Sequence, residues 1–313
     1  MKRIAIPAAV AVAVILAFVL TAGPPAATPN PPGAFSFAVF GDAPYYRHEE
    51  LQHRIVLRHI DAHDLDAAIH IGDIFWRPCS DAMYAKSRGT LDALRHPLIY
   101  TPGDNEWSDC WEPRVGGYVP LERLAHLRRT FFREPTRSLG RRRIALTPQP
   151  DFPENARWEL HGVVFATVHI VGSWNATERF PGRTPADDAE SRARTLAAAA
   201  WVRETFAFAR AANARAVVIA FHANPRFERP QDRAHFQPFL SALEQEVARF
   251  GRPVLAAHGD THTYTADRPL PGAPNLTRLQ VPGSPDVGWV RVVVQPDTTW
   301  SFSKYVVPRW KYW

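Results

Sequence analysis

The sequence predicts an α/β fold in which a mostly parallel sheet is followed by a second or mixed sheet. In the first half of the 313 residues, strand-like and helix-like segments alternate, as they do in βαβ units. The C-terminal part adds strand-like segments with no helix between them. The composition, 46% hydrophobic and 22% charged, is that of a globular protein rather than a disordered one.

The first half is expected to contain three short strands, each followed by a helix. The strands are short apolar runs bounded by turn residues, and the helices carry apolar residues at helical spacing. The predicted strands are residues 35–40, 66–71 and 98–101, and the predicted helices are residues 48–64, 81–95 and 120–132.

The second half is expected to begin with a hairpin around His161-Gly162, followed by a long Ala-rich helix over residues 187–212. The other predicted helix is residues 234–250, and the predicted strands are residues 158–160, 163–170, 216–221, 253–257, 276–281, 289–293 and 300–307. Two segments rich in Pro and Arg, expected to be surface loops, are residues 134–157 and 172–186.

Residues 1–30 are expected to lie outside the fold, as a leader and linker. Lys2 and Arg3 precede an apolar run that ends near Leu20, and small residues and prolines follow, which is the order of a secretory signal peptide. The run is also long enough to remain as an N-terminal membrane anchor, so its cleavage stays open. The sequence thus predicts a periplasmic or secreted protein, membrane-attached only through this segment, with one domain over residues 33–313.

The charge of the chain bears on its partners. The formal net charge is +6, and loss of Lys2 and Arg3 with the leader leaves +4. Most basic residues are Arg and no block of Lys and Arg is present, so nucleic acid is not an expected partner. The mild excess of positive charge favours a small phosphorylated substrate.

The chain has two cysteines, Cys79 and Cys110, each six positions after an aspartate at a predicted strand end. In an oxidising compartment, two cysteines on neighbouring loops readily pair. A Cys79–Cys110 disulfide is therefore predicted, and two buried free thiols are the alternative.

Five predicted strands end in polar residues that an ordinary loop does not require. Ligands bind at the carboxyl ends of strands in open α/β sheets, and glycine allows the backbone to approach closely there. A cluster of Asp, Asn and His at such an edge has the composition of a metal site. The strand ends are Gly41-Asp42, Gly72-Asp73, Gly103-Asp104-Asn105-Glu106, His222-Ala223-Asn224 and His258-Gly259-Asp260-Thr261-His262.

The spacing of these motifs favours a shared site over isolated turns. A single Gly-Asp pair is more often only a turn. However, Asp42 to Asp73 and Asp73 to Asp104 are both 31 residues, which is the size of one βαβ unit. His222 and the turn ending at His262 then follow, so the set is expected to act together.

In their order, these motifs resemble those of the calcineurin-like metallophosphoesterases, namely D-x-H, G-D, G-N-H-[DE], a lone His after a strand, and G-H-x-H. The matching residues are Asp42, Asp73, Gly103–Glu106, His222 and Gly259–His262. The resemblance covers residues 35–295 and implies a metallophosphoesterase-like β-sandwich of mixed sheets flanked by helices.

Several positions depart from the family pattern. Pro44 stands where D-x-H has its His, and Asp260 stands where G-H-x-H has its first His. Asp104 and Asn105 replace the Asn and His of G-N-H-E. Purple acid phosphatases, a branch of the family, also lack the first His and use the Tyr of G-D-x-x-Y, where this chain has Trp76.

Transfer of the family's roles, residue by residue, implies two divalent metal ions, drawn from Mn, Mg, Ca, Fe and Zn. Asp73 would bridge them, and aspartates in place of Asn and His shift the preference towards harder ions. Asn105 is the implied catalytic residue, able to orient a phosphate oxygen but unable to donate a proton. The implied metal ligands are Asp42, Asp73 and His262 on one side, one fewer than usual, and Asp73, Asp104, His222 and Asp260 on the other.

The resemblance thus implies an exported metallophosphoesterase that hydrolyses phosphomonoesters or phosphodiesters with metal-activated water. The alternative is a non-catalytic ligand-binding protein on the same scaffold with a degenerate metal site, which Pro44 and Asn105 favour. Side chains able to bind a metal at most other positions favour the enzyme. Tyr45 and Tyr46 are expected either to line the mouth of the site or to cover the first loop.

Overall fold

The computed structural model describes residues 29–309. The expected signal peptide or anchor over residues 1–30 lies outside them, except for its last two residues. Within the part of the chain that is described, no helix is both long enough and apolar enough to cross a membrane.

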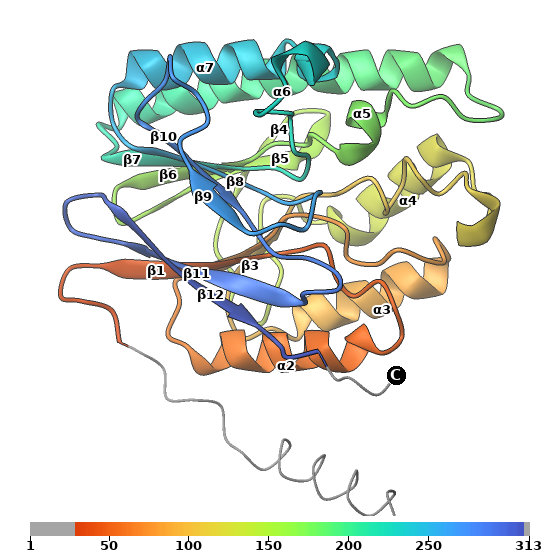
Figure 1. Ribbon diagram of the computed structural model, residues 1–313, viewed down its shortest axis with the longest axis horizontal. Coiled ribbons are helices and arrows are strands. Elements are labelled where there is room, and N and C mark those ends of the chain that lie inside the picture. Colours follow the sequence, from red (N-terminus) through yellow and green to blue (C-terminus); the bar gives the residue numbers. More distant parts are fainter. Residues whose placement is uncertain (1–28, 310–313) are drawn as a thin grey trace, which may run out of the picture.

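The fold is a sandwich of two mixed β-sheets flanked by helices (Figure 1). One sheet has five strands in the order β12-β11-β1-β2-β3, and the other has seven in the order β4-β5-β6-β7-β8-β10-β9. In Figure 1, α2 (Glu49–Ala62) and α3 (Asp81–Asp92) lie below the five-stranded sheet, and α6 (Pro185–Ala211) and α7 (Phe239–Phe250) lie above the seven-stranded sheet. The expected fold class is confirmed.

The five-stranded sheet carries the first three motifs. Its strands β1 (Phe35–Phe40), β2 (Ala67–His70) and β3 (Leu98–Tyr100) are parallel, and α2 and α3 connect them. Strands β11 (Gly288–Val294) and β12 (Trp300–Val306) extend the sheet in antiparallel fashion. Every residue of β1, β2, β3 and β11 is buried, as expected for strands covered on both faces. The carboxyl ends of the three parallel strands therefore share one edge.

The seven-stranded sheet has a parallel centre and antiparallel edges. Its centre consists of β6 (Val163–Thr167), β7 (Ala216–Ala220), β8 (Val254–His258) and β10 (Leu276–Gln280). The antiparallel edge strands are β4 (Thr147–Gln149), β5 (Phe152–Leu160) and β9 (Thr265–Asp267). Strands β5 and β6 form the hairpin that the sequence predicts around His161-Gly162.

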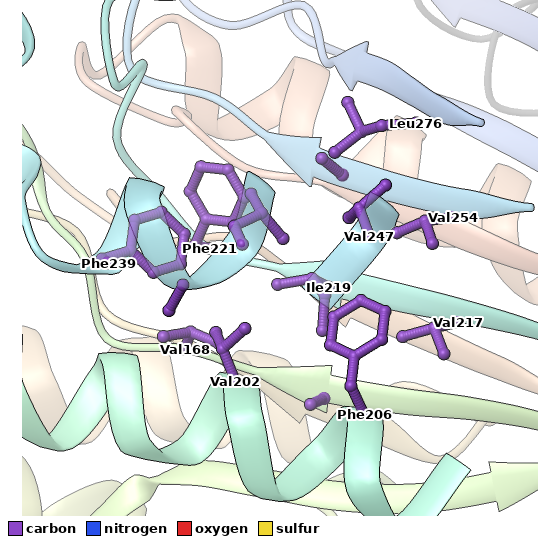
Figure 2. Packing of buried hydrophobic residues seen from close by; sticks show 14 of the residues in the cluster. Val168, Val202, Phe206, Val217, Ile219, Phe221, Phe239, Val247, Val254 and Leu276 are labelled. Atoms are coloured by element: carbon purple, nitrogen blue, oxygen red, sulfur yellow. The ribbon is translucent and has the colours of Figure 1, made fainter. Parts of the chain in front are cut away.

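Three apolar layers hold the molecule together. The first fills the space between the sheets, and the second packs the five-stranded sheet against α2, α3 and α4 (Pro120–Phe131). The third packs the seven-stranded sheet against α6 and α7, and Figure 2 shows Val202, Ile219 and Val247 within it. Since each fully buried side chain of this kind contributes roughly 1.5–3 kcal/mol, the layer between the sheets stabilises their packing on each other, and the outer layers stabilise the packing of the helices on the sheets.

The segment over residues 134–157, expected to be a loop, contains β4 and most of β5. Polar residues at buried positions of β5 interrupt the apolar pattern, so the sequence pattern does not predict a strand there. Glu154 and Asn155 are fully buried, because Glu154 pairs with Arg128 at 2.6 Å and with His169 at 2.9 Å. Asn155 accepts a hydrogen bond from the main-chain N–H of His169 at 2.6 Å. Burial is stable here only because each polar group has a partner.

The other expected loop, residues 172–186, contains α5 (Gly172–Ala176), a left-handed turn. Its last four residues have φ between 49° and 59°, a backbone that costs L-residues about 1–2 kcal/mol each. Asn175 holds the turn, since its fully buried amide accepts a hydrogen bond from Arg194 and donates one to Thr195 at 2.8 Å. Such a turn depends on tertiary contacts, so local propensity does not predict it.

One helix begins later than expected. The helix predicted from residue 234 is α7, which begins at Phe239 after a 3₁₀ segment over Pro230–Phe236. Pro238 disfavours helical backbone at the residue before it. Gln237 is accordingly extended, with φ −80° and ψ 143°, and this residue separates the two helical segments.

Cys79 and Cys110 form a disulfide, which confirms the predicted pairing. Their Cα atoms are 5.8 Å apart, and the bond joins the loop after β2 to the loop after β3. The Sγ atom of Cys79 lies 3.4 Å from the main-chain oxygen of Asn105. The bridge therefore packs against the turn that carries two residues of the predicted site.

We expect the double variant Cys79→Ser/Cys110→Ser to unfold more easily than the wild type. The bond closes a loop with a sequence separation of 31 residues, so its loss should lower the free energy of unfolding by about 2–4 kcal/mol. Urea denaturation followed by tryptophan fluorescence measures this change. A thiol reagent added to the unfolded, unreduced wild type should find no free thiol, whereas two reactive thiols per chain would contradict the bridge.

Candidate metal centre

The polar strand ends meet at one edge of the sandwich and come from both sheets. Asp42, Asp73 and Asp104 follow β1, β2 and β3 of the five-stranded sheet. His222 follows β7, and His262 lies in the turn after β8, in the seven-stranded sheet. Neighbouring parallel strands alone do not bring these ends together. The packing of one sheet on the other completes the cluster.

Two groups of side chains offer ligand atoms that lie within 4.8 Å of one another. The first group is Asp42, Asp73 and His262, and the second is Asp73, Asp104 and His222. Asp73 belongs to both groups, which is the position required of a bridging carboxylate. The structure therefore brings together five of the six side chains predicted as ligands.

The backbone turns several of these side chains into the cluster. Asp42, Asp73, Asp260 and His262 have φ of 54°, 56°, 75° and 60°, in the left-handed region. Residues other than glycine adopt this region rarely, and such strain concentrates at functional sites. Strands β1, β2 and β8 are thus each followed by a sharp turn that carries polar side chains of the cluster.

Two of the motif glycines make room for the carboxylates. A Cβ atom at Gly103 would collide with Oδ1 of Asp73, and one at Gly259 would collide with Oδ2 of Asp42. The sequence interpretation, that glycine allows close backbone approach before a polar residue, is correct at these two positions.

The ring of His222 is oriented for metal binding. It is fully buried, and its Nδ1 lies 2.9 Å from the main-chain oxygen of Ile71, which can only accept a hydrogen bond. Its Nε2 faces Asp104 Oδ1 at 2.9 Å and Asp73 Oδ1 at 3.5 Å. A ring that donates one N–H to a backbone carbonyl and directs the other nitrogen at carboxylates has the arrangement of a histidine ligand.

His262 repeats this arrangement in the first group. Its Nδ1 lies 2.7 Å from the main-chain oxygen of Ser284, so Nδ1 carries the proton and Nε2 is free to accept. Nε2 lies 3.6 Å from Asp42 Oδ1. Oδ2 of Asp42 is buried and has no hydrogen-bond partner among the described residues. Nε2 of His262 and Oδ1 of Asp42 are thus two acceptors that face each other, as ligands do around a cation.

The electrostatics of the cluster favour positive charge. Burial raises the pKa of Asp42, and it raises the pKa of Asp73 well above its usual range, with nearby carboxylates adding to the effect. Burial alone would lower the pKa of His222, but Asp73, Asp104 and Asp42 raise it well above its usual range. The residues therefore fit a divalent cation, which can supply the positive charge that these carboxylates otherwise draw from a proton.

Asp260, the sixth predicted ligand, is in neither group. Its Oδ2 accepts a hydrogen bond from the main-chain N–H of Asn224 at 2.9 Å, and its own N–H donates to Asp42 Oδ1 at 3.0 Å. Burial raises its pKa to about 6. In this structure Asp260 links the loops after β7 and β8 to Asp42, and its role as a ligand stays a prediction.

Asn105, the predicted catalytic residue, contacts the bridging carboxylate. Its side-chain amide donates to Asp73 Oδ2 at 2.8 Å, and its main-chain N–H donates to Asp73 Oδ1 at 3.1 Å. These bonds fix the orientation of Asp73. The predicted contact of Asn105 with a phosphate oxygen is a separate matter and stays a prediction.

Glu106 shapes the turn beside Asn105. Its carboxylate accepts hydrogen bonds from the main-chain N–H groups of Ile74 at 2.7 Å and of Gly103 at 3.0 Å. Burial raises its pKa to about 7. Glu106 therefore joins the loops after β2 and β3 at a second point, besides the disulfide.

Tyr45 is a site residue that the sequence analysis did not identify as a ligand. Its hydroxyl donates a hydrogen bond to Asp73 Oδ2 and lies 3.2 Å from His262 Nε2. It thus contacts two members of the first group, on the side where the resemblance implies one ligand fewer than usual because Pro44 stands in place of a His. The spacing Asp42-x-x-Tyr45 is the sequence feature that could have indicated Tyr45 as a site residue, since a phenol three residues after the aspartate can reach back over the turn.

Ser173 and Asp109 are two further residues that sequence reasoning missed. The Ser173 hydroxyl lies 2.9 Å from Asp104 Oδ2 and 2.8 Å from Asp109 Oδ2. Burial and the charge of Asp104 raise the pKa of Asp109 well above its usual range. The Ser173 hydroxyl, which has a single proton to donate, thus lies between the carboxylates of Asp104 and Asp109 and links them. The left-handed turn α5 is what places Ser173 there.

No protein-family model and no curated protein matches the sequence. Among solved structures, the chain is similar to a 5'-nucleotidase from Candida albicans SC5314, with 12% identity and a TM-score of 0.46 over 86% of this chain and 50% of that one. The chain thus spans about half the length of that nucleotidase. It is also similar to a protein serine/threonine phosphatase from Saccharomyces cerevisiae with similarity to human phosphatase PP5, with 9% identity and a TM-score of 0.36 over 90% of this chain and 82% of that one.

Because Asp73 is shared by both groups, Asp73→Asn should remove bound metal more completely than Asp42→Asn, which affects one group. The amide keeps the size of the carboxylate and removes its charge. Metal content after reconstitution with Mn²⁺ and dialysis, measured by mass spectrometry, tests this order. Asp297→Asn, at an exposed turn, is the matched control. Equal metal content in the wild type and the Asp73 variant would rule out the site.

Tyr45→Phe should weaken metal binding at the first group more than at the second, because the phenol contacts His262 as well as the shared Asp73. Loss of a group that binds or supports a ligand typically costs about 10–100-fold in metal affinity. Calorimetric titration with Mn²⁺ should therefore show one binding step weakened more than the other, relative to the wild type. Tyr46→Phe, a change at the exposed neighbouring residue, is the control and should leave both steps unchanged. Identical titrations for Tyr45→Phe and the wild type would show that the phenol has no part in metal binding.

Proposed function

We propose that this protein is an exported, metal-dependent phosphoesterase of the calcineurin-like type. One observation carries the proposal. Two sets of acceptor atoms converge on a shared carboxylate, Asp73, and the two histidines that complete them are each held by a backbone carbonyl. Such an arrangement suits two neighbouring divalent ions, and paired ions of this kind serve phosphoester hydrolysis.

The two ion sites would differ in their donors. The first ion would be held by Asp42, Asp73, His262 and the hydroxyl of Tyr45. This donor set is rich in oxygen. Asp73, Asp104 and His222 would hold the second. Oxygen-rich sets favour hard ions such as Mg²⁺ and Mn²⁺. When bound, such ions supply Lewis acidity, lower the pKa of water and neutralise charge on a phosphate group.

The chain's own residues would orient these donors and, by burying them, exclude water from their surroundings. Asn105 fixes Asp73 by two hydrogen bonds, and Ser173 fixes Asp104. Asp42 and His222 are fully buried, so their interactions with a bound ion would act in a medium of low dielectric. Donors fixed in advance in this way need no reorganisation during a reaction, which is the condition for strong electrostatic stabilisation.

Asn105 also sets a limit on the reaction. An amide cannot protonate a leaving group, and general acid catalysis is typically worth about 10²–10⁴-fold. Four aspartates contribute negative charge near the proposed ions, which weakens the attraction for a phosphate dianion. They are Asp42, Asp73, Asp104 and Asp260. We therefore infer slow turnover of esters with poor leaving groups and faster turnover of activated esters.

Export is part of the same proposal. The order of charged, apolar and small residues in the first 30 positions is that of a secretory leader. The Cys79–Cys110 disulfide supports an oxidising destination, because such bonds persist outside the cytosol.

Asn105→His should raise the hydrolysis of an alkyl phosphate more than that of an aryl phosphate. Glycerol phosphate needs a proton at its leaving oxygen, whereas 4-nitrophenyl phosphate does not. Steady-state kcat/KM values for the two esters, measured with the Mn²⁺-loaded wild type and variant, give the comparison. Because Asn105 also orients Asp73, the metal content of the variant must first be shown to equal that of the wild type.

The result also bears on the alternative function. A wild type that hydrolyses both esters equally fast, with chemistry rate-limiting, would mean that another residue supplies the proton. A wild type that holds metal and hydrolyses neither these monoesters nor the diester bis(4-nitrophenyl) phosphate, with each of the candidate ions, would contradict the enzyme and support a binding protein on this scaffold.

A further inference from the structure

A separate cavity of about 440 Å³ lies between α2, α3 and the loop after β1. These two helices lie under the five-stranded sheet in Figure 1. The cavity shares Tyr45 with the candidate metal centre, but none of the five aspartate and histidine side chains that form the two ligand groups lines it. Its volume is within the range of small-molecule sites, about 300–1,000 Å³.

Two buried histidines line the cavity and have nitrogen atoms without partners. His70, at the end of β2, is fully buried, and its Nδ1 accepts a hydrogen bond from the main-chain N–H of Gly72 at 3.2 Å. Its proton is therefore on Nε2, which has no acceptor among the described residues. His53 on α2 is 7% exposed, and its Nε2 is also unpartnered among these residues.

These nitrogen atoms require a partner that the described protein does not supply. Leaving a buried donor unsatisfied costs about 1–3 kcal/mol. Burial lowers the pKa of His53 to about 4 and that of His70 well below its usual range, so both rings are neutral at pH 7. The floor of the cavity thus offers an uncharged donor, suited to an uncharged acceptor such as a carbonyl oxygen or a ring nitrogen.

The rim of the cavity is cationic. Arg47, Arg54 and Arg77 are exposed, and no carboxylate pairs with them among the described residues. Lys86 also lies at the rim, where Glu50 pairs with it at 2.7 Å. Guanidinium groups bind phosphate, sulfonate and carboxylate by paired hydrogen bonds, so the rim suits an anion.

Apolar side chains make up most of the remaining lining. They are Pro44, Ile74, Phe75, Met83 and Leu91. The cavity thus has three parts in series, namely an uncharged donor on the floor, apolar walls and guanidinium groups at the mouth. A free inorganic anion would use only the last of these.

We propose that this cavity binds an organic anion, whose uncharged body carries an acceptor for His70 and whose phosphate, sulfonate or carboxylate group meets the arginines at the rim. The site is distinct from the metal centre and does not require the proposed hydrolysis. A ligand in it would contact Tyr45, whose hydroxyl reaches the metal centre.

Four small probes distinguish the contributions of the three parts of the cavity to binding. 4-Acetylbenzenesulfonate has an acceptor, an aromatic body and an anionic group. Benzenesulfonate lacks the acceptor, acetophenone lacks the charge, and sulfate lacks the body. Calorimetric titration of the full chain, freed of metal by chelation, should show the first probe binding more tightly than each of the others by about tenfold.

Variants then assign the binding to this cavity. Arg54→Gln should weaken 4-acetylbenzenesulfonate by about tenfold, and the matched control Arg203→Gln, on the exposed face of α6, should have no effect. His70→Phe should weaken 4-acetylbenzenesulfonate but not benzenesulfonate. Because a buried change can perturb folding, Thr90→Trp on α3, which fills the cavity from a half-buried position, should abolish binding independently.

Absence of measurable binding to the wild type would overturn the proposal. Equal affinity for sulfate and 4-acetylbenzenesulfonate would also overturn it, as simple adsorption of anions. So would unchanged affinity in Arg54→Gln and Thr90→Trp, both shown to be folded by circular dichroism. Since metal-free protein is used, failure here leaves the proposed hydrolysis untouched, and absence of hydrolysis leaves this site untouched.

Discussion

The position of the Asp73 carboxylate is the constraint on which the rest of the site depends, because one side chain has to serve both ligand groups. Asn105 holds it from the loop after β3, and Tyr45 holds it from the loop after β1. The loop that carries it is in turn tied to the β3 loop by Glu106 and by the Cys79–Cys110 disulfide. Loops are the mobile parts of most folds, and these contacts join three of them to one another around Asp73.

The second requirement is the placement of one sheet on the other. His222 and His262 come from the seven-stranded sheet, whereas all three aspartates of the ligand groups come from the five-stranded sheet. A shift of one sheet across the other would separate nitrogen from carboxylate ligands. The apolar layer between the sheets, fully buried over most of its residues, opposes such a shift, since packed interiors tolerate little displacement. Packing between the sheets thus also keeps the nitrogen and carboxylate ligands of the site together.

Much of the fold and most of the candidate ligand cluster could be predicted from the sequence, because strands with continuous apolar runs and helices with regular spacing can be recognised from local sequence alone. Five of six expected ligands converge. What could not be predicted depends on distant partners. Glu154 is buried in a strand only because Arg128 and His169 reach it, and the left-handed turn at Asn175 forms only because α6 supplies its hydrogen bonds. The position of Tyr45 likewise depends on Asp73, 28 residues away.

The central claim is that Asp73 bridges two ions at the junction of the sheets, and crystallography of the Mn²⁺-loaded protein tests it most directly. Anomalous difference maps should show two peaks about 3.5–4 Å apart. One peak should lie among Asp42, Asp73, His262 and the Tyr45 hydroxyl, and the other among Asp73, Asp104 and His222. Full-occupancy peaks elsewhere, a single peak that does not contact Asp73, or no peak at saturating Mn²⁺ would contradict the account.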